Sequence, residues 1–409
     1  MTVTVPSARP ALRVVAGPPE APPQPRGSTG AVVLAAVTLV ALTLSFTAGS
    51  AVTLVAGEEA ARLVGPVMLA VAAVGALAIA VRALSGGALR DVGLACLAAA
   101  PLLVSTALSG ARGEGSYAVF AAAEAVACVL LVSSGRWLDV RAAATLALAL
   151  LVGISLVAAL AVPQLSIPGR DFLPVLYDGR VAGVLEHPNG LGLVSGLLVL
   201  SGLSVRGRRL RVAAVALGAV GLAASASQTS SIATVIALLI TGLATGWLRV
   251  RSPSGRLALL AAGLAVVVVV VAAVAYTGVV SALVSGDTVD TTLSGRTDIW
   301  SSLLGSGSVP ALGLGHYGTA QLISDLTRVG STHNVWIDAY LVDGMAGIAA
   351  LVLAILAFVW GAVREARRGS AVALGVLVGF LVVGVTESGP THPAFYLLVA
   401  AAVLGFARR

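Results

Sequence analysis

The chain has 409 residues, of which 58% are hydrophobic and 11% charged, and its mean hydropathy is +1.01. This composition excludes an ordinary soluble globular protein and is typical of a polytopic helical membrane protein. The net charge is +7, but the basic residues are all arginines scattered over short loops, and they form no patch of the kind that binds nucleic acid. Cys96 and Cys128 fall in apolar stretches and imply no disulfide framework.

Residues 1–28 are polar and rich in proline and lack the apolar core of a signal peptide, which predicts a disordered cytoplasmic tail. The remainder, 29–409, is expected to be one all-α integral membrane domain. A helix that crosses the bilayer needs about 20 apolar residues, and we expect about twelve such spans. They lie near 31–55, 63–83, 89–109, 117–134, 141–162, 188–205, 211–226, 229–248, 257–280, 334–361, 370–387 and 392–407.

The distribution of arginines predicts the orientation of these spans. With the N-terminus inside, nineteen arginines fall on the cytoplasmic side and six on the outer side, which obeys the positive-inside rule. The outer six are Arg62, Arg112, Arg170, Arg180, Arg296 and Arg328. Two outer loops, about 163–187 and about 281–333, are long, and loops of this length usually carry function. We therefore expect a multi-pass protein of the cell membrane with both termini in the cytoplasm and its site at the outer face.

The histidines are also expected on the outer side, and most of them precede a helix that runs inward. They are His187, His316, His333 and His392, and the first, third and fourth stand in EHPNG, STHNVW and PTHPAF. Asn189 and Thr332 are plausible capping residues of two of these helices. A helix N-terminus attracts anions and disfavours imidazolium, so a histidine there is expected to stay neutral near pH 7 and to accept a proton.

Arginines near such histidines suit one class of substrate. Guanidinium groups bind phosphate oxygens in a fixed fork and need no metal. Outer arginines, helix N-termini and a neutral histidine therefore favour a lipid-linked diphosphate, whose departure the arginines assist while the histidine activates an acceptor hydroxyl. Neither a metal nor a cofactor is expected.

Structural interpretations of the same residues stay open. An outer histidine at a helix start can simply cap the helix, and an outer arginine can pair with lipid headgroups or with a loop acid. The candidate acids are Asp171, Asp178 and Asp298. The DTVD stretch at 287–290 can be a metal pair or a solvated loop. Glu124 and Glu387 lie within or at the end of apolar segments, where an acid is costly and should face a partner or a cavity.

Four segments carry a resemblance to the O-antigen ligase / O-antigen polymerase superfamily, the membrane glycan ligases and polymerases. They are GRVAGVLEHPNGLG (179–192), SGRTDIW (294–300), ALGLGHYG (311–318) and STHNVWIDAYLVDGMAGIAAL (331–351). The segments occur in the family's order, with the long external loop in the expected place. The resemblance covers about 165–400.

The resemblance implies a metal-independent, inverting glycosyltransferase that uses an undecaprenyl-diphosphate-linked glycan at the outer face, as a surface polysaccharide polymerase or a ligase. By position, Arg180 and Arg296 would contact the diphosphate, and His333 would be the acceptor base or its positioner. The expected substrate-binding residues are Asn334, Asn189, His187, His316, Arg170 and Arg328. The implied partners are the lipid-linked donor, a glycan or cell-surface acceptor, the bilayer, and other membrane proteins of polysaccharide assembly.

The chain departs from the family at one point. Many members carry Ser-Arg near the start of a middle helix, where this chain has SASQTSS (225–231), with Gln228 or Ser230 at that position. One phosphate contact is then missing or comes from elsewhere, for which Arg170 and Arg328 are candidates. Two other functions remain as alternatives: a twelve-span secondary transporter, which usually has internal repeats and mid-membrane charges that this sequence lacks, and a non-catalytic scaffold.

Overall fold

The computed structural model describes most of the chain between Thr29 and Phe406. The described ranges are 29–85, 92–134, 139–162, 165–167, 180–185, 187–205, 207–255, 257–258, 296–305, 309–326, 331–387 and 393–406. Apart from one two-stranded sheet and a 3-10 turn, the elements in these ranges are α-helices, which confirms the all-α class.

The helices occur in the following order. They are α1 (Thr29–Thr47), α2 (Gly49–Ser85), α3 (Val92–Ala98), α4 (Ala100–Ala111), α5 (Gly115–Ser133), α6 (Val140–Ala161), α7 (Pro188–Gly202), α8 (Arg208–Ser225), α9 (Gln228–Arg249), α11 (Arg296–Gly305), α12 (Gly315–Leu326), α13 (Val335–Ala366), α14 (Val372–Thr386) and α15 (Pro393–Phe406). Between α6 and α7, the strands β1 (Ser166–Ile167) and β2 (Arg180–Val181) pair antiparallel and are followed by the 3-10 turn η2 (Gly183–Leu185).

Several of these helices are suited to cross a membrane. Among the described residues, five are long and apolar enough: Ala51–Arg82, Gly115–Ser133, Val140–Ala161, Gln228–Arg249 and Val335–Ala366. The bent pair α3 and α4, with 62° between its two halves, makes a sixth if it forms one span. Helices α1, α7 and α14 are apolar but shorter. The expected count of about twelve spans is therefore not confirmed, and the span predicted at 257–280 lies outside the described residues apart from its first two.

One predicted boundary is right only in part. The sequence suggested a loop between a first span at 31–55 and a second at 63–83, yet α1 ends at Thr47 and α2 runs from Gly49 to Ser85. An interruption does occur inside the predicted loop, but it is a kink at Gly57, with φ +85°. The charged residues that suggested a loop lie on the helix after this kink, where the exposed Glu58 and Arg62 form an i,i+4 ion pair at 3.6 Å, a spacing typical of a helix.

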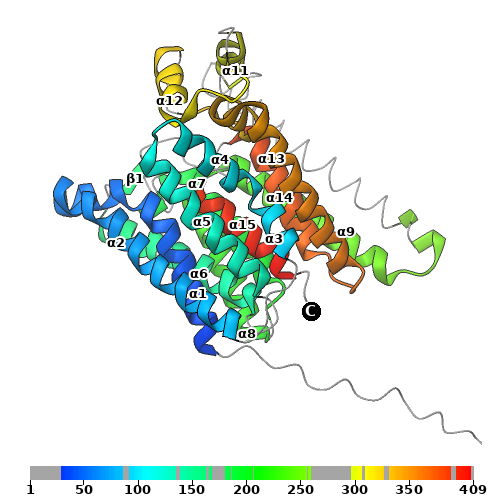
Figure 1. Cartoon of the computed structure of the whole chain (residues 1–409). Helices are drawn as coiled ribbons and strands as arrows, with labels where there is room; N and C mark the ends of the chain where they lie inside the picture. The colour runs from blue at the N-terminus through cyan, green and yellow to red at the C-terminus, as the bar shows by residue number, and fades with distance from the viewer. Residues whose placement is uncertain are drawn as a thin grey trace, which may run out of the picture.

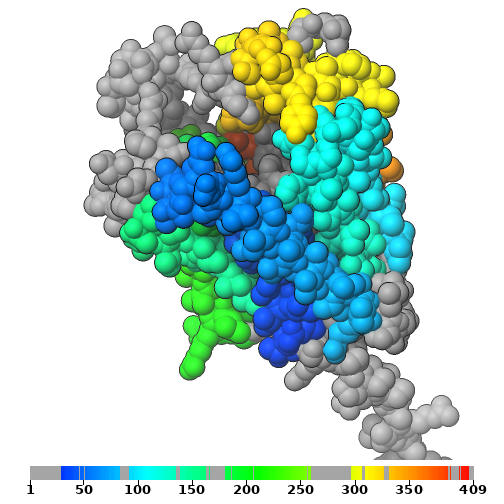
Figure 2. Space-filling model, turned by 60° about the vertical axis from the view of Figure 1, so that its left-hand side comes forward, coloured from blue at the N-terminus to red at the C-terminus, as the bar shows by residue number. Residues whose placement is uncertain are grey.

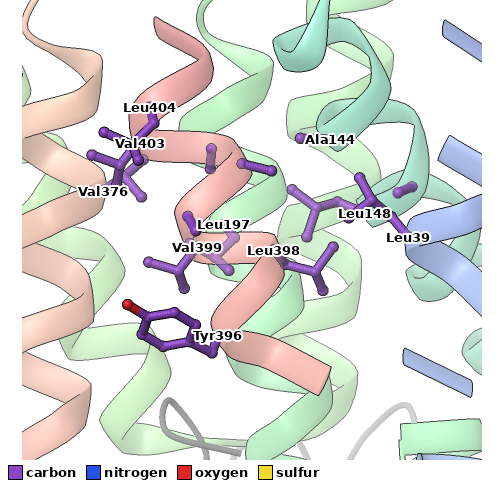
Figure 3. Close-up of a cluster of buried hydrophobic side chains, with 14 of the residues drawn as sticks. Leu39, Ala144, Leu148, Leu197, Val376, Tyr396, Leu398, Val399, Val403 and Leu404 are labelled. Atoms are coloured by element: carbon purple, nitrogen blue, oxygen red, sulfur yellow. The ribbon is translucent and has the colours of Figure 1, made fainter. Parts of the chain in front are cut away.

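Helix α15 forms the centre of the bundle. It is apolar on all sides, and its residues Leu398–Leu404 are at most 1% exposed, as expected for a helix surrounded by other helices. Figure 3 shows Tyr396, Leu398 and Val403 of α15 among side chains from the surrounding helices. The labelled neighbours are Leu39 of α1, Ala144 and Leu148 of α6, Leu197 of α7 and Val376 of α14.

The two ends of the bundle differ. Helices α11 and α12 and the start of α13 lie together at one end, whereas α1 begins and α15 ends toward the other (Figure 1). Figure 2 shows a recess bordered by the yellow α11–α12 region and the cyan α4–α5 region, with red C-terminal residues visible at its base. The end of the bundle with α11 and α12 is called the site end below.

The central position of α15 predicts a large stability difference between two leucine truncations. Leu398 is fully buried in α15, whereas Leu356 on α13 is 58% exposed. We expect Leu398→Ala to lower the free energy of unfolding by roughly 2–5 kcal/mol because it leaves a cavity. Leu356→Ala serves as the matched control and should change it by less than about 1 kcal/mol. Thermal unfolding in detergent measures both, and equal effects would contradict the central placement of α15.

Candidate functional site

Helix α11 carries two polar anchors on one face. Arg296 begins the helix and Trp300 follows one turn later, a spacing that places both side chains on the same side. The Arg296 Nη2 donates to Glu387 Oε1 at 2.6 Å. The indole Nε1 of Trp300 donates to the carbonyl oxygen of Thr332 at 2.9 Å. The SGRTDIW segment thus holds its arginine against an acid and its tryptophan against the loop that precedes α13.

Asn334 caps α13. Its Oδ1 accepts from the amides of Trp336 at 2.9 Å and Ile337 at 3.1 Å, which satisfies two of the free N–H groups of the first turn. Its Nδ2 donates to the carbonyl oxygen of Val385 at 3.0 Å and so joins α13 to the end of α14. The prediction that Thr332 caps this helix is wrong. The Thr332 hydroxyl instead bonds to the backbone of Asn334, because it stands two residues before this cap residue.

His333 lies in a strained backbone conformation beside this cap. Its φ is +50°, in the left-handed region that side chains other than glycine rarely adopt. The Ser331 hydroxyl accepts from the His333 amide at 3.2 Å, and the neighbouring Thr332 and Asn334 are both fixed. Such strain persists only where the surroundings determine the conformation, and it concentrates at functional sites. The strained backbone directs the imidazole Nδ1 to within 3.3 Å of Glu387 Oε2.

Glu387 is the centre of the cluster. It follows the last residue of α14, and its side chain is 8% exposed. Oε1 accepts from Arg296 and, at 2.8 Å, from Asn189 Nδ2, while Oε2 faces His333. The sequence expectation that this acid faces a partner is confirmed. Its part in a common site with the predicted arginines and histidine was not foreseen, and the only sequence signal was a carboxylate at the end of an apolar segment.

Arg180 and Asn189 complete the cluster. Arg180 is placed by strand β2, and its Nη2 donates to Asn189 Oδ1 at 2.8 Å, while its Nε donates to the carbonyl oxygen of Ser225 at 3.2 Å. Burial lowers the pKa of the Arg180 guanidinium and the neighbouring Arg296 adds to this, whereas Glu387 raises it. Guanidinium stays charged in proteins nevertheless, so Glu387 has two positive groups beside it, Arg296 in direct contact and Arg180 through Asn189.

His187, and not Asn189, caps α7. Its Nδ1 accepts from the amide of Asn189 at 3.1 Å, which leaves the Asn189 side chain free to bridge Arg180 and Glu387. The predicted cap at Asn189 is wrong, because α7 begins at Pro188 and Asn189 is already inside its first turn. Since Nδ1 is an acceptor, the neutral ring carries its proton on Nε2 and can only donate at that atom.

The surroundings of His187 disfavour its charged form. Although part of the residue is exposed, burial lowers the pKa of the imidazole, and Arg180, His333 and Arg296 lower it further against the opposing effect of Glu387. This direction agrees with the expectation that a histidine at such a helix start stays neutral.

The SASQTSS segment, where many family members have an arginine, borders the cluster with small polar groups. The Ser225 carbonyl oxygen contacts Arg180, and Ser227 caps α9 through the amide of Ser230. The Ser230 hydroxyl lies 3.5 Å from the carbonyl oxygen of Asn189. Arg170 and Arg328, the two predicted substitutes for the missing arginine, lie outside the described residues.

Other predicted site residues have different places. His316 contacts Ser105, Glu114 and Tyr117 and belongs to a separate cluster at the site end. Asp298, a predicted partner for an arginine, is exposed on α11, and Arg296 pairs with Glu387 instead. His392, Asp171, Asp178 and the DTVD stretch lie outside the described residues. Within the described ranges, no three or more His, Cys, Asp or Glu side chains are grouped so that they could hold a metal ion.

The arrangement is chemically suited to bind an anion. Arg180 and Arg296 approach the same small region, and their only acidic neighbour among the described residues is Glu387. If the Nδ1 of His333 donates to Glu387, its Nε2 is unprotonated and can accept a proton. The site therefore combines two fixed cations, one hydrogen-bond donor on His187 and one acceptor on His333.

Comparison with known families gives one match. Residues 212–351, about a third of the chain, match the family model described as O-Antigen ligase. The matched segment contains Arg296, Trp300 and His333, whereas Arg180, Asn189 and Glu387 lie outside it and join the site through the fold. The match confirms the resemblance to the O-antigen ligase and polymerase superfamily. No curated protein matches the chain.

The lowered pKa of His187 predicts a pH-dependent stability. The unfolded chain binds a proton on this residue near pH 6.5, whereas the folded chain resists protonation. Stability contributed by His187 is therefore present above about pH 6.5 and is lost as the pH falls below it. His187→Asn keeps a good helix cap and removes the titration. Thermal unfolding at about pH 7.5 and about pH 5.5 should show a larger loss for the wild type than for the variant, and identical losses would contradict the assigned environment.

Proposed function

We propose that this chain, whose residues 212–351 match the O-antigen ligase family, is a membrane glycosyltransferase. It transfers a glycan from an undecaprenyl-diphosphate-linked donor to a hydroxyl group of an acceptor, at the outer face of the cell membrane. The observation that carries the proposal is the pair of guanidinium groups, Arg180 and Arg296, gathered around one buried carboxylate next to an available imidazole. The family match supports a glycan ligase or polymerase and gives no support to a transporter.

The arginines hold the leaving group in this mechanism. A diphosphate brings several negative oxygens to Arg180 and Arg296, and it competes with Glu387 for the N–H group of Arg296 and with Asn189 for that of Arg180. As the bond between the anomeric carbon and the diphosphate oxygen breaks, the electron pair leaves with the oxygen. The fixed guanidinium groups stabilise the charge that develops there. Two arginines supply the positive charge that a divalent cation supplies in other transferases, so the mechanism needs no metal.

His333 acts on the acceptor. Its Nε2 takes the proton of the acceptor hydroxyl as the oxygen forms a bond to the anomeric carbon, opposite to the departing diphosphate, and the configuration inverts. Glu387 accepts from Nδ1–H, which fixes the tautomer and stabilises the imidazolium that forms. The Nε2–H of His187 is a further donor for phosphate or sugar oxygens. A polymerase and a ligase differ in the acceptor alone, and both use this one site.

The proposal predicts a strict requirement for arginine at position 296. Arg296→Ala removes a donor to the leaving group, and we expect turnover to fall by about 10²–10³. Arg296→Lys keeps the charge but loses the planar fork and should also be strongly impaired. Arg62→Ala, which removes an exposed arginine paired with Glu58 on α2, is the control and should transfer normally. The measurement is glycan transfer in proteoliposomes with a lipid-linked oligosaccharide. Wild-type rates for both Arg296 variants would disprove the assigned role.

The roles of His333 and Glu387 predict effects on turnover rather than on donor binding. His333→Ala should lower kcat by about 10²–10⁴ with little change in donor KM. Glu387→Gln removes the orienting carboxylate and also a competitor for Arg296, so kcat should fall by at least about tenfold while donor binding is not weakened. Steady-state kinetics with varied donor separates the two parameters. Weakened donor binding at an unchanged kcat in either variant would contradict the base and its positioning residue.

A further inference from the structure

A second polar cluster lies at the site end, where helix α13 is interrupted. Gly344 has φ +65° and ψ −149° and breaks the helix. The turn before α12 fills the gap, because the Leu314 amide donates to the carbonyl oxygen of Leu341 at 2.7 Å and the Met345 amide donates to that of Ala311 at 3.0 Å. A β-carbon at Gly313 would lie 2.4 Å from the Val342 carbonyl oxygen, so the close approach requires glycine.

Residues of the α4–α5 turn hold the start of α12 in place. The Glu114 carboxylate accepts from the amides of His316 at 3.2 Å and Tyr317 at 3.0 Å. Burial raises the pKa of this carboxyl, but these backbone hydrogen bonds outweigh it and the net pKa is lowered. Arg112 donates to the carbonyl oxygen of Leu312. The backbone around the cluster is therefore rigid, and Figure 2 shows the yellow α12 region against the cyan α4–α5 region.

Three aromatic rings form a platform on this frame. Tyr117 and His316 stack with ring centroids 4.2 Å apart and planes within 6°. Tyr317 meets Tyr117 edge-on, with centroids 5.4 Å apart and an interplanar angle of 79°. Tyr317 is 59% exposed and Tyr117 is 37% exposed. Ser105 hydrogen-bonds to the His316 Nε2 at 3.2 Å, which fixes the histidine within the stack.

Polar groups beside the platform lack hydrogen bonds. In the described part of the chain, Arg112 Nη1, Asp343 Oδ1 and Thr319 Oγ1 are buried without a hydrogen-bond partner. Arg112 Nη1 and Asp343 Oδ1 form an ion pair at 3.8 Å, a distance too long for a hydrogen bond, and the two side chains are 22% and 10% exposed. Buried donors and acceptors are rarely left in this state without a reason. A ligand hydroxyl group, which both donates and accepts, matches such a pair.

We propose that the cluster of Arg112, Tyr117, Tyr317 and Asp343 is a binding subsite for sugar units of a glycan. The tyrosine rings offer apolar faces to the C–H face of a sugar, and the guanidinium and carboxylate offer complementary partners to its hydroxyls. The position also fits. Asp343 comes nine residues after Asn334 on the same helix, a rise of about 14 Å, so an extended glycan reaching from His333 would place a sugar unit beyond the first here.

This inference rests on the proposed function and specifies where the glycan lies. Exposed tyrosines also occur at membrane interfaces, where they anchor a protein among lipid headgroups. An anchor would require neither the rigid backbone frame nor an Arg112–Asp343 ion pair whose facing atoms lack hydrogen bonds. The two roles differ in whether a water-soluble oligosaccharide binds.

The test uses oligosaccharides of one, two and four repeat units, released by mild acid from the host's own surface polysaccharide. Binding to the purified full-length protein is measured by tyrosine and tryptophan fluorescence or by thermophoresis. We expect the longer oligosaccharides to bind and Tyr317→Ala to weaken their binding about three- to tenfold, while Tyr317→Trp preserves it. Trp360→Ala changes another exposed aromatic residue, which lies on α13 and away from α12; it is the matched control and should bind normally. No binding to the wild type, or equal binding to wild type and Tyr317→Ala, would overturn the subsite.

Parallel transfer assays separate this inference from the proposed function. Arg296→Ala should still bind the free oligosaccharides, which carry no diphosphate, although it transfers poorly. If Tyr317→Ala raises the KM for the acceptor, the subsite holds the acceptor glycan, and if it raises the KM for the donor, it holds the donor glycan. An active wild type with unaffected Tyr317→Ala kinetics refutes the subsite alone. A wild type that binds oligosaccharide but transfers nothing from any lipid-linked donor refutes the proposed function.

Discussion

The contact between the buried Glu387 carboxylate and Arg296 is the interaction on which the site depends. Two guanidinium groups gathered in a largely buried region repel each other and lose hydration. Glu387 offsets both costs by pairing directly with Arg296 and, through Asn189, with Arg180. The same carboxylate orients His333. Because one acid serves all these partners, it is the only acidic group among the described residues that holds the cationic groups of the site in place.

This dependence makes the site a product of the whole fold. Arg180 comes from the short hairpin before α7, Arg296 from α11, His333 from the loop before α13, and Glu387 from the end of α14. The matched family segment contains only the middle two. The hairpin and the C-terminal helices are therefore as necessary to the geometry as the segment that carries the family's pattern. The surrounding helices pack closely around α15 at the centre of the bundle, and this packing fixes the relative positions of the helices from which the site is built.

Sequence reasoning predicted the features that depend on local chemistry. Long apolar runs marked most of the described helices, and the positions of His187 and His333 next to helix starts followed from Pro188 and the asparagines nearby. The convergence of Arg180, Arg296 and His333 was expected from the order of the family's segments. The prediction could not include Glu387, because only tertiary packing brings the end of α14 close to α11. Hydropathy placed a loop at Glu58 and Arg62, since it does not register that an i,i+4 pair can face outward on a helix.

The separate place of His316 has a similar cause. The resemblance places its segment, ALGLGHYG, at the predicted site, whereas the glycines allow the turn to fit into the break of α13. That break depends on Gly344, which looks like any other glycine of an apolar helix in the sequence. One glycine therefore influences to which cluster a histidine 28 residues earlier belongs.

The break in α13 also has a consequence for the surrounding lipid. The part of the helix after it, Met345–Ala366, rises about 33 Å, close to the hydrocarbon thickness of a bilayer. The preceding turns, with Asp343 and the loop that carries His333, then fall at the level of the headgroups. A thinner or thicker membrane would shift that level through hydrophobic mismatch. Under the proposed function, the length of this one helical segment sets the depth at which a lipid-borne phosphate meets these side chains.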